Sequence, residues 1–485
     1  MLREVDGSGR VQAIGERSAI VRTILSAVLW LLLTQRTRLR LEILMRRLSL
    51  AGLSLPLLIG CGTDEASQPD AGENREAKRA AAEEVQTSVT AGATLAWRPA
   101  VGKPPAGWTG PVFALSRGYP TQLPGPPEGG YPWDPIDPTT QPRSYMQAVL
   151  DYARADLEAV DWDPTKLERP NWFHAPWMAT GRPRDSGREF IHGLTRERWS
   201  RSGELSPKQT NDYIPNYAVG LYNDVGGFTF GQVWANPSAP DLRQGKAKFR
   251  DGAVAIKLLF TKANPDVEGD GVPYLVGSKE WQANIAPFRS DNREPDTLRL
   301  LQVDIAVRDR DATTTGWLFG TFVYNGYADG ETPLDRLEPV GLMWGDSPGF
   351  LPAKVDQGEL PPEQWINDDV GTYQHYGWAK RVNGPVDNPR SSCMSCHGHS
   401  AAWPPPEQMV PPSNLSDIQK LPWFENVLAG QTSLPGSVSL DYSLQMAVGL
   451  EAWERSSIGR LASGDAARAG QSHRQISREE DPRRR

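Results

Sequence analysis

The sequence predicts an α+β fold that is mainly β, an antiparallel sheet with flanking helices and long loops. Glycine and proline are abundant, with Gly 46 and Pro 42 in 485 residues, and this composition favours short strands joined by loops. Apolar and polar residues alternate in several segments of the middle of the chain, without the regular strand–helix alternation of a parallel sheet. A hydrophobic content of 39% is enough for an ordinary core.

The N-terminal segment carries the pattern of an export signal. The tetrapeptide Leu58–Cys61 resembles the lipobox of bacterial lipoproteins, and the apolar run Leu48–Ile59 follows Met45 and two arginines. That run is too short to span a bilayer. We therefore predict that residues 1–60 are an upstream extension followed by a lipoprotein signal peptide, with Met45 as the true start.

Cleavage at this lipobox would leave Cys61 as a lipidated N-terminus. The next residue is Gly62 and not Asp, so the resemblance to lipoprotein sorting signals implies the outer membrane. We expect a lipid-anchored protein on the periplasmic side of the cell envelope, which is an oxidising compartment. The formal net charge is −7 although residues 1–60 carry nine Arg or Lys and four acidic residues, so the exported part is more acidic still. This charge argues against a nucleic-acid partner and suits a basic redox partner.

Two regions are expected before the main domain. Residues 61–95 are polar and rich in alanine, which predicts a flexible tether without a core. Residues 96–165 are predicted to form an arm rich in proline and glycine, followed by a helix over Ser144–Val160. The helix is indicated by apolar residues at helical spacing: Met146, Val149, Leu150, Ala153 and Leu157.

Residues 166–460 are predicted to form a β-rich domain that binds haem. The first two of its strands are expected to form a hairpin across Asp224 and Val225, and another pair is joined by the turn at 309–311. A helix over Leu440–Ser457 closes the domain, and residues 461–485 are predicted to be a disordered tail. The expected strands are Asn216–Asn223, Gly226–Trp234, Gly252–Thr261, Thr297–Arg308, Thr315–Tyr324, Val340–Trp344 and Tyr376–Val382.

The pentapeptide Cys393–His397 is a C-x-x-C-H motif, the attachment signature of a c-type haem. Two thiols at this spacing can each add to one vinyl group of a porphyrin, and the histidine is then held under the iron as axial ligand. A chance match, a redox dithiol and half a zinc site are the alternatives. Cys61 is the one further cysteine, which excludes a four-cysteine zinc site. The flanking segments are rich in proline and read as loops, which is not the setting of a thioredoxin-like motif.

These residues predict one covalent haem c near the C-terminal end of the domain, bound by Cys393 and Cys396 with His397 as iron ligand. A small electron-transfer cytochrome of class I carries its motif near the start, on a helix, whereas here the motif follows the strands and lies in a loop. Further ligand candidates are read as ordinary packing or core residues: His174, His192, Met409 and Met446.

The segment Phe249–Lys257 resembles the F-R-D-G-x-x-x-x-K segment of the cytochrome P-460 family and its cytochrome c′-beta relatives. The order is similar too, since Tyr274–Gly277 and then C-x-x-C-H follow. The resemblance implies a small antiparallel sheet with helices and one five-coordinate haem with an open distal face. It places Lys257 at the position that is bonded to the porphyrin edge in the members that oxidise hydroxylamine. In the c′-beta members no such bond forms, and the haem binds nitric oxide or similar diatomics.

The distal side departs from this pattern. The oxidising members carry a glutamate where the nearest match here is Gln282, and an amide cannot act as the general base that a carboxylate can be. Gln282 and Lys257 are the candidates for distal or haem-edge groups. The stretch Trp172–Trp403 also resembles uncharacterised cytochrome-like proteins of bacterial envelopes that contain N-G-P-V-D-N-P-x-S-S-C-x-S-C-H, and that resemblance implies no activity.

Lys257 shares its strand face with Ala253, Ala255 and Leu259, and a charged lysine there needs a partner. It could be bonded to the haem edge, pair with a haem propionate, or reach solvent over apolar neighbours. The expected function is that of a redox or small-ligand haem protein acting on a nitrogen oxide or oxygen species, with a haem oxidoreductase as one form. The alternatives are a plain electron carrier that docks to a redox partner, or an accessory lipoprotein with a structural haem.

Overall fold

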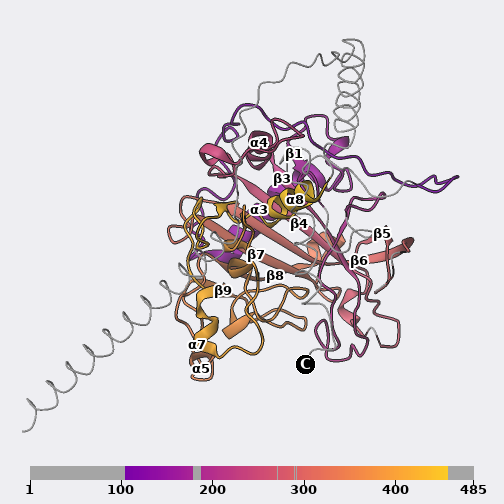
Figure 1. The fold of residues 1–485 in the computed structure, drawn as a ribbon. Helices are drawn as coiled ribbons and strands as arrows, with labels where there is room; N and C mark the ends of the chain where they lie inside the picture. The colour runs from indigo at the N-terminus through magenta and orange to yellow at the C-terminus, as the bar shows by residue number, and fades with distance from the viewer. Residues whose placement is uncertain (1–103, 179–186, 270, 289, 291, 457–485) are drawn as a thin grey trace, which may run out of the picture. The chain divides into compact units, whose positions relative to one another are not determined.

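The computed structural model describes residues 104–178, 187–269, 271–288, 290 and 292–456 (Figure 1). All of these residues belong to one compact unit, which falls within residues 79–485. The predicted signal peptide, lipid-bearing Cys61, tether and C-terminal tail lie outside the described residues.

A nine-stranded antiparallel sheet forms the centre of the described part of the chain. Its order is β1-β3-β4-β6-β7-β8-β9, with β2 also beside β3 and β5 also beside β6. The prediction of a mainly β, antiparallel α+β fold is therefore confirmed. The strands are β1 (Trp172–His174), β2 (Thr195–Arg196), β3 (Asn216–Asn223), β4 (Val254–Thr261), β5 (Glu280–Ile285), β6 (Glu294–Arg308), β7 (Trp317–Tyr324), β8 (Leu337–Met343) and β9 (Gln364–Ile366), with β10 (Ala401–Ala402) and β11 (Val438–Ser439) in a separate pair.

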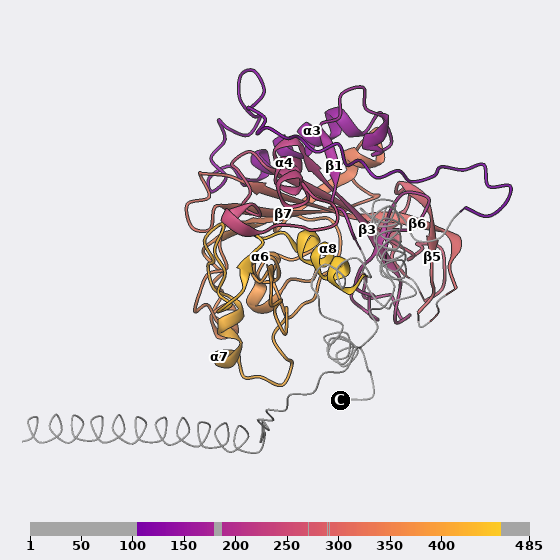
Figure 2. The same cartoon turned by 45° about the horizontal axis from the view of Figure 1, so that its top comes forward.

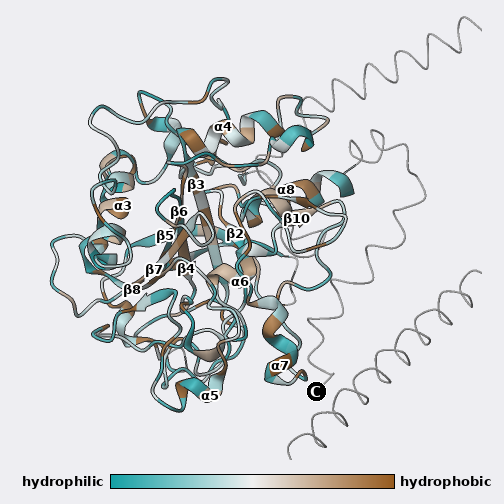
Figure 3. Ribbon diagram, turned by 90° about the vertical axis from the view of Figure 1, so that its left-hand side faces the viewer, coloured by the Kyte–Doolittle hydropathy of each residue, from teal (hydrophilic) through white to brown (hydrophobic). Residues whose placement is uncertain are grey.

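Helices flank the sheet on both sides. Figures 2 and 3 show α3 on one side of the strands and α6 with α8 on the other. In the described ranges, no helix is both long enough and apolar enough to cross a membrane. The α-helices are α3 (Pro142–Leu157), α4 (Asp224–Val233), α5 (Pro352–Val355), α6 (Cys393–Gly398), α7 (Asp417–Lys420) and α8 (Leu444–Arg455). The 3₁₀ turns are η1 (Pro164–Lys166), η2 (Arg243–Gly245), η3 (Pro273–Leu275), η4 (Pro333–Arg336), η5 (Trp378–Lys380) and η6 (Leu421–Trp423).

The two faces of the sheet differ in composition, because successive residues of a strand point to opposite sides. Ile256 of β4 lies opposite Ile305 of β6, which lies opposite Gly320 of β7, and this apolar face packs on α3. A Cβ atom on Gly320 would lie 3.0 Å from the methyl group of Met146. The opposite face, toward α6 and α8, carries smaller and more polar residues and holds the candidate site.

The predicted strand Gly226–Trp234 is wrong, because this segment is helix α4. Asn223 ends β3 and its side-chain oxygen accepts a hydrogen bond from the backbone N–H of Gly226 at 3.0 Å, which makes it an N-cap. The apolar residues Phe230 and Val233 are then buried on one side of a helix. The apolar pattern of this segment is compatible with the period of a strand and with that of a helix, and the N-cap at Asn223 selects the helix.

The predicted strand Tyr376–Val382 is also wrong. This segment contains η5, in which Ala379 has a φ of 54°, and the sheet edge beside β8 is occupied by β9 instead. The strand β5 was not predicted, although it pairs with β6 along its whole length. The helix predicted over Ser144–Val160 is confirmed as α3, and the helix predicted over Leu440–Ser457 is confirmed in its described part as α8.

Candidate haem site

The C-x-x-C-H motif forms the short helix α6, not the loop that its flanks predicted. Ser392 caps the helix: its Oγ accepts from the N–H of Ser395 at 2.8 Å, and the Ser395 Oγ accepts from the N–H of Ser392 at 2.8 Å. Residues three and four positions apart share one side of a helix. Cys393 and Cys396 therefore project on the same side as His397, and all three are half-buried whereas their helix neighbours are buried.

His397 is held in the form that can bind iron. Its Nδ1 lies 2.8 Å from the carbonyl oxygen of Tyr442, and because a carbonyl only accepts, Nδ1 carries the hydrogen. The lone pair is then on Nε2. Burial lowers the pKa of His397 to about 4, against the opposing effect of the Tyr442 hydrogen bond, so the ring is neutral at physiological pH. A neutral imidazole oriented through its other nitrogen is the usual axial or metal ligand.

The imidazole of His397 packs on the sheet through Phe319, with ring centroids 4.5 Å apart. Phe319 of β7 lies opposite Ala306 of β6, which lies opposite Ala255 of β4. The two alanines are half-buried, and their short side chains leave this part of the sheet face beside the histidine unobstructed. Small side chains next to the motif are what a flat macrocycle requires.

The next row on the same face contains Lys257. Lys257 lies opposite Asp304, which lies opposite Thr321. Because residues two apart on a strand share a face, this row is about 7 Å from the row that contacts His397. The structure thus brings Lys257 beside the motif. On β3, the residue opposite Lys257 is Gly220, where a Cβ atom would collide with Gln445 of α8.

The partners of Lys257 are carboxylates of the protein. Its Nζ lies 3.4 Å from Glu197 Oε2 and 3.9 Å from Asp304 Oδ2, and its side chain is 27% exposed. Burial alone would lower the pKa of Lys257, but the carboxylates of Glu197, Asp304 and Asp387 outweigh burial and raise it. Lys257 is therefore charged. A haem bond, a propionate and solvent were the predicted alternatives for this lysine, and these acids were not predicted.

Three acids surround this one lysine, and we name Lys257, Glu197, Asp304 and Asp387 the Lys257 cluster. The Asp304 Oδ1 accepts from Gln302 Nε2 at 2.7 Å, and the Asp387 Oδ2 accepts from the same nitrogen at 3.2 Å. Burial, with a further contribution from Asp387, raises the pKa of Glu197 and of Asp304. The cluster thus holds more negative than positive charge and has carboxylates that take up protons more readily than usual.

The sequence contains a pattern that indicates one of these acids, Asp304, but not the other two. Asp304 stands at an alternating position of a predicted strand, on the face that also carries Gln302 and Ala306, so a polar face could have been recognised. Asp387 lies in the loop N-G-P-V-D-N-P before the motif, and Glu197 follows the two-residue strand β2. No local pattern connects these two residues to β4.

Gln282, the other distal candidate, is not brought to this site. It is exposed on β5 and lies opposite Thr297 of β6. Along β6, Thr297 and Asp304 are roughly 23 Å apart at the rise of an extended strand. Gln282 therefore lies at the far end of the sheet from the Lys257 cluster.

The two further histidines considered as ligands have structural partners, as predicted. His174 is buried, its Nδ1 accepts from the N–H of Ser116 at 3.0 Å, and burial lowers its pKa well below the usual value. His192 stacks on Trp281 with ring centroids 4.3 Å apart, and its Nδ1 lies 2.9 Å from the carbonyl oxygen of Gln282.

The two methionines considered as ligands differ in position. Met446 is fully buried in α8, as predicted for a packing residue. The carbonyl oxygen of Met409 lies 4.0 Å from the Sγ of Cys396, so this residue is next to the motif. Met409 is half-buried.

The donor set at α6 fits a covalent haem. Cys393 and Cys396 are free thiols, His397 offers Nε2, and all three border a face with small side chains. Comparison with known protein families, curated proteins and solved structures finds no match to this chain. The resemblance to the cytochrome P-460 family therefore stays a prediction. Across the described residues, no group of three or more His, Cys, Asp and Glu side chains is arranged to hold a metal ion directly.

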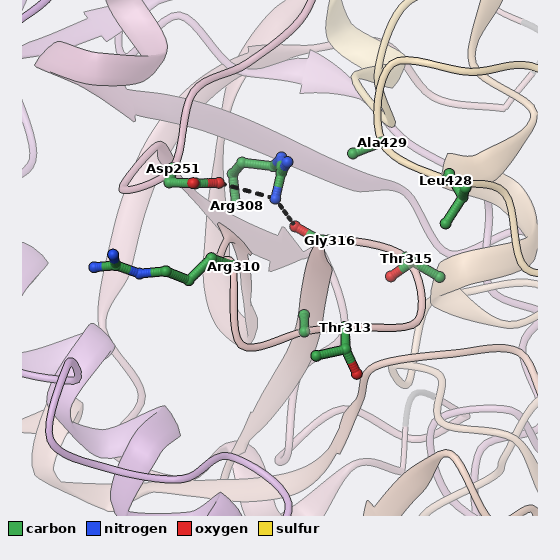
Figure 4. Close-up of a pocket in the computed structure, with 9 residues that line it drawn as sticks. Asp251, Arg308, Arg310, Thr313, Thr315, Gly316, Leu428 and Ala429 are labelled. Carbon is green, nitrogen blue, oxygen red and sulfur yellow. Dashed lines mark hydrogen bonds and ion pairs between the residues drawn. The ribbon is translucent and has the colours of Figure 1, made fainter.

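A separate pocket of 330 Å³ lies at the turn between β6 and β7 (Figure 4). Arg308 crosses it, with Nη1 3.0 Å from Asp251 Oδ1 and 2.7 Å from the carbonyl oxygen of Gly316. Leu428 and Ala429 border its other side. None of the C-x-x-C-H side chains lines this pocket, so it is not the candidate haem site.

Proposed function

We propose that this chain is a monohaem c-type cytochrome of the bacterial cell envelope, with one haem attached to Cys393 and Cys396 and its iron bound by His397. The observation that carries the proposal is the contact of His397 Nδ1 with the Tyr442 carbonyl oxygen, because it puts the hydrogen of the ring on Nδ1 and leaves the lone pair on Nε2. When bound, the haem supplies an iron that exchanges electrons and can offer a coordination position to a small ligand.

The Lys257 cluster favours a redox or small-ligand haem protein over a plain electron carrier. Oxidation or reduction of a nitrogen oxide or oxygen species consumes or releases protons, whereas electron transfer alone does not. Glu197 and Asp304 have raised pKa values and are partly exposed, at 29% and 24% of their side chains, so they can exchange protons with a bound ligand. The lipobox at Cys61 supports a lipid anchor and a periplasmic location for this activity.

A plain electron carrier is the second candidate, and the position of Met409 favours it. The residue lies next to Cys396, and a methionine sulfur is a usual sixth ligand of electron-transfer haems. The spin state of the ferric protein distinguishes the two functions. We expect a high-spin, five-coordinate iron for the small-ligand protein, whereas a low-spin, six-coordinate iron that becomes high-spin in Met409→Ala would favour the carrier.

Covalent attachment is the first test. The full chain is produced in a host that attaches c-type haem, denatured and extracted with acidified acetone. We expect the haem to stay with the polypeptide, at one haem per chain by mass spectrometry, and the tryptic peptide that contains Cys393 and Cys396 to carry it. In the matched Cys393→Ser/Cys396→Ser variant the haem should be extracted. Release of all haem from the unaltered chain would contradict the proposal.

A further inference from the structure

A second group of charged side chains lies next to the motif, and it consists of Arg381 and Asp346. We call these two residues the sealed pair, because neither side chain is reached by solvent. The guanidinium of Arg381 is fully buried, with 0% of its side chain exposed. It donates to the backbone carbonyls of Asp346 at 2.8 Å, Ser347 at 3.0 Å, Trp378 at 3.1 Å and Phe350 at 3.2 Å. Aromatic rings pack on its planar group, with the guanidinium carbon 4.6 Å from the Phe424 ring centroid and 5.0 Å from that of Trp378.

The anionic partner of this arginine reaches the motif. Asp346 is 1% exposed, and its Oδ1 lies 3.6 Å from Arg381 Nε. The same oxygen accepts from the Ser392 Oγ at 2.6 Å. Asp346 Oδ2 accepts no hydrogen bond within the described part of the chain. Because the Ser392 hydrogen is directed to Asp346, the lone pairs of its oxygen are left for the N–H of Ser395, which is the cap of α6.

The segment around Arg381 is also joined to α6 by its backbone. The N–H of Cys393 donates to the carbonyl of Val382 at 3.2 Å, and the N–H of Trp378 donates to the carbonyl of Ser391 at 3.0 Å. The start of α6 is thus held by one backbone hydrogen bond at Cys393, by a second at Ser391 just before the cap, and by Asp346 through Ser392. A buried ion pair costs desolvation and often adds little net stability, so its use here calls for another reason.

We propose that Arg381 and Asp346 are positioning residues for the haem, which act through Ser392 to fix the direction in which α6 presents its two thiols and its imidazole. This inference rests on the proposed covalent haem. The arginine holds the aspartate, the aspartate orients the serine hydroxyl, and the hydroxyl holds the first turn of the helix. Ser392 directly precedes Cys393 and caps the helix, whereas Arg381 and Asp346 act through it. Their effect is on the geometry of Cys393, Cys396 and His397.

The test compares Ser392→Ala, which removes the relay oxygen, with Ser392→Thr, which keeps it. Ser392→Ala is expected to lower the covalent haem content of folded protein by about threefold to tenfold, since a lost cap loosens the first turn of the helix. Ser392→Thr should restore most of it. Thr332→Ala is the matched control, because it removes the same kind of capping box from η4, whose Asp335 pairs with Arg154 of α3 on the other side of the sheet from α6. Its haem content should equal that of the unaltered chain.

Asp346→Asn gives an independent readout, because the amide keeps the shape and an acceptor oxygen but removes the charge. The reduction potential of the holoprotein should rise, since loss of a buried negative charge near the haem favours the reduced iron. A purely structural role would change the melting temperature and leave the potential unchanged.

The outcomes separate the two proposals. If the unaltered chain carries no covalent haem, the proposed function and this inference both fall. If it carries haem, and Ser392→Ala, Ser392→Thr and Asp346→Asn all match it in haem content and potential, the inference alone is overturned. Should Asp346→Asn fail to fold, the two serine variants decide.

Discussion

Two groups of charged side chains lie next to the C-x-x-C-H helix, and they differ in access to solvent. The Arg381–Asp346 pair is sealed, with side-chain exposures of 0% and 1%, and its hydrogen bonds go mainly to backbone carbonyls. The Lys257 cluster is partly open, with 27% of Lys257 and 24% of Asp304 exposed. A sealed pair can hold structure but cannot exchange protons with a ligand. An open cluster with more acids than bases can do so.

The same difference predicts how each group responds to the loss of its cation. In the sealed pair, the remaining carboxylate would have neither water nor a counter-ion. In the open cluster, water can reach the acids and part of the cost is screened. The following variants compare the two groups, from the largest expected effect to the smallest.

Arg381→Met should have the largest effect. It leaves Asp346 buried without its counter-ion, and we expect the free energy of unfolding to fall by about 3–5 kcal/mol at pH 8. Burial already raises the pKa of Asp346 to about 7, against the opposing effect of Arg381, so the loss should be smaller at acidic pH, where the carboxyl group is protonated. Chemical denaturation measures this change. Arg310→Met is the control, because Arg310 is exposed on the turn after β6 and its loss should cost less than about 0.5 kcal/mol. Equal stability of the two variants would show that the sealed pair does not support the fold.

Lys257→Met should cost less, about 1–2 kcal/mol at neutral pH, because the three acids that lose their cation are partly exposed. The cost should decrease at acidic pH as these carboxyl groups take up protons. Lys262→Met is the matched control at the end of β4, since Lys262 pairs with Asp296 at 2.5 Å but is 44% exposed. A Lys257→Met variant whose stability relative to the unaltered chain is the same at acidic and neutral pH would contradict the assigned role of the acids.

The sequence predicted the strands that carry this cluster but not the cluster itself. In β4 and β6 one apolar face is buried and several residues of the other face are partly exposed, and this difference appears as alternation in the sequence. The segments that were predicted wrongly depend on single side chains: Asn223 caps α4, and Arg381 is held by carbonyls of residues far along the chain. A local pattern cannot encode such contacts.

The residues of the candidate site likewise divide into those that the local sequence predicts and those that it does not. Cys393, Cys396 and His397 lie within five consecutive residues, so the motif itself predicts them, and Lys257 is predicted by strand alternation together with a family resemblance. Glu197 and Asp387 lie in segments without periodicity; β2 brings Glu197 to Lys257, and a hydrogen bond from Gln302 holds the loop residue Asp387 there. The one wrongly placed candidate, Gln282, was chosen by a short sequence match, and the register of β5 against β6 directs it elsewhere.

Asp304→Asn tests the pH response of the open cluster. Folding raises the pKa of Asp304, because burial and Asp387 disfavour its charge more than Lys257 favours it. The folded chain therefore binds this proton more tightly, and the ionised carboxylate costs stability above the folded pKa. Below the unfolded value of about 3.9 this cost is absent.

The asparagine cannot ionise, so the variant should gain about 1 kcal/mol over the unaltered chain at pH 7 to 8 and no such gain near pH 4. Denaturation curves at both pH values, with Asp296→Asn as the control from the same strand, measure the difference. A gain that is larger at pH 4 than at pH 8 would reverse the assigned direction of the pKa shift.

Gln282→Ala should have the smallest effect, because Gln282 belongs to neither group. Its side chain is exposed on β5, and the contact of this residue with His192 is made by its backbone carbonyl, which the substitution keeps. An exposed change of this kind alters stability by less than about 0.5 kcal/mol. The haem spectrum, haem content and ligand binding of the holoprotein should equal those of the unaltered chain. If Gln282→Ala changed the spectrum while Asp304→Asn did not, the distal side of the haem would have to lie at β5, and the Lys257 cluster would lose its place as the proton-exchanging group.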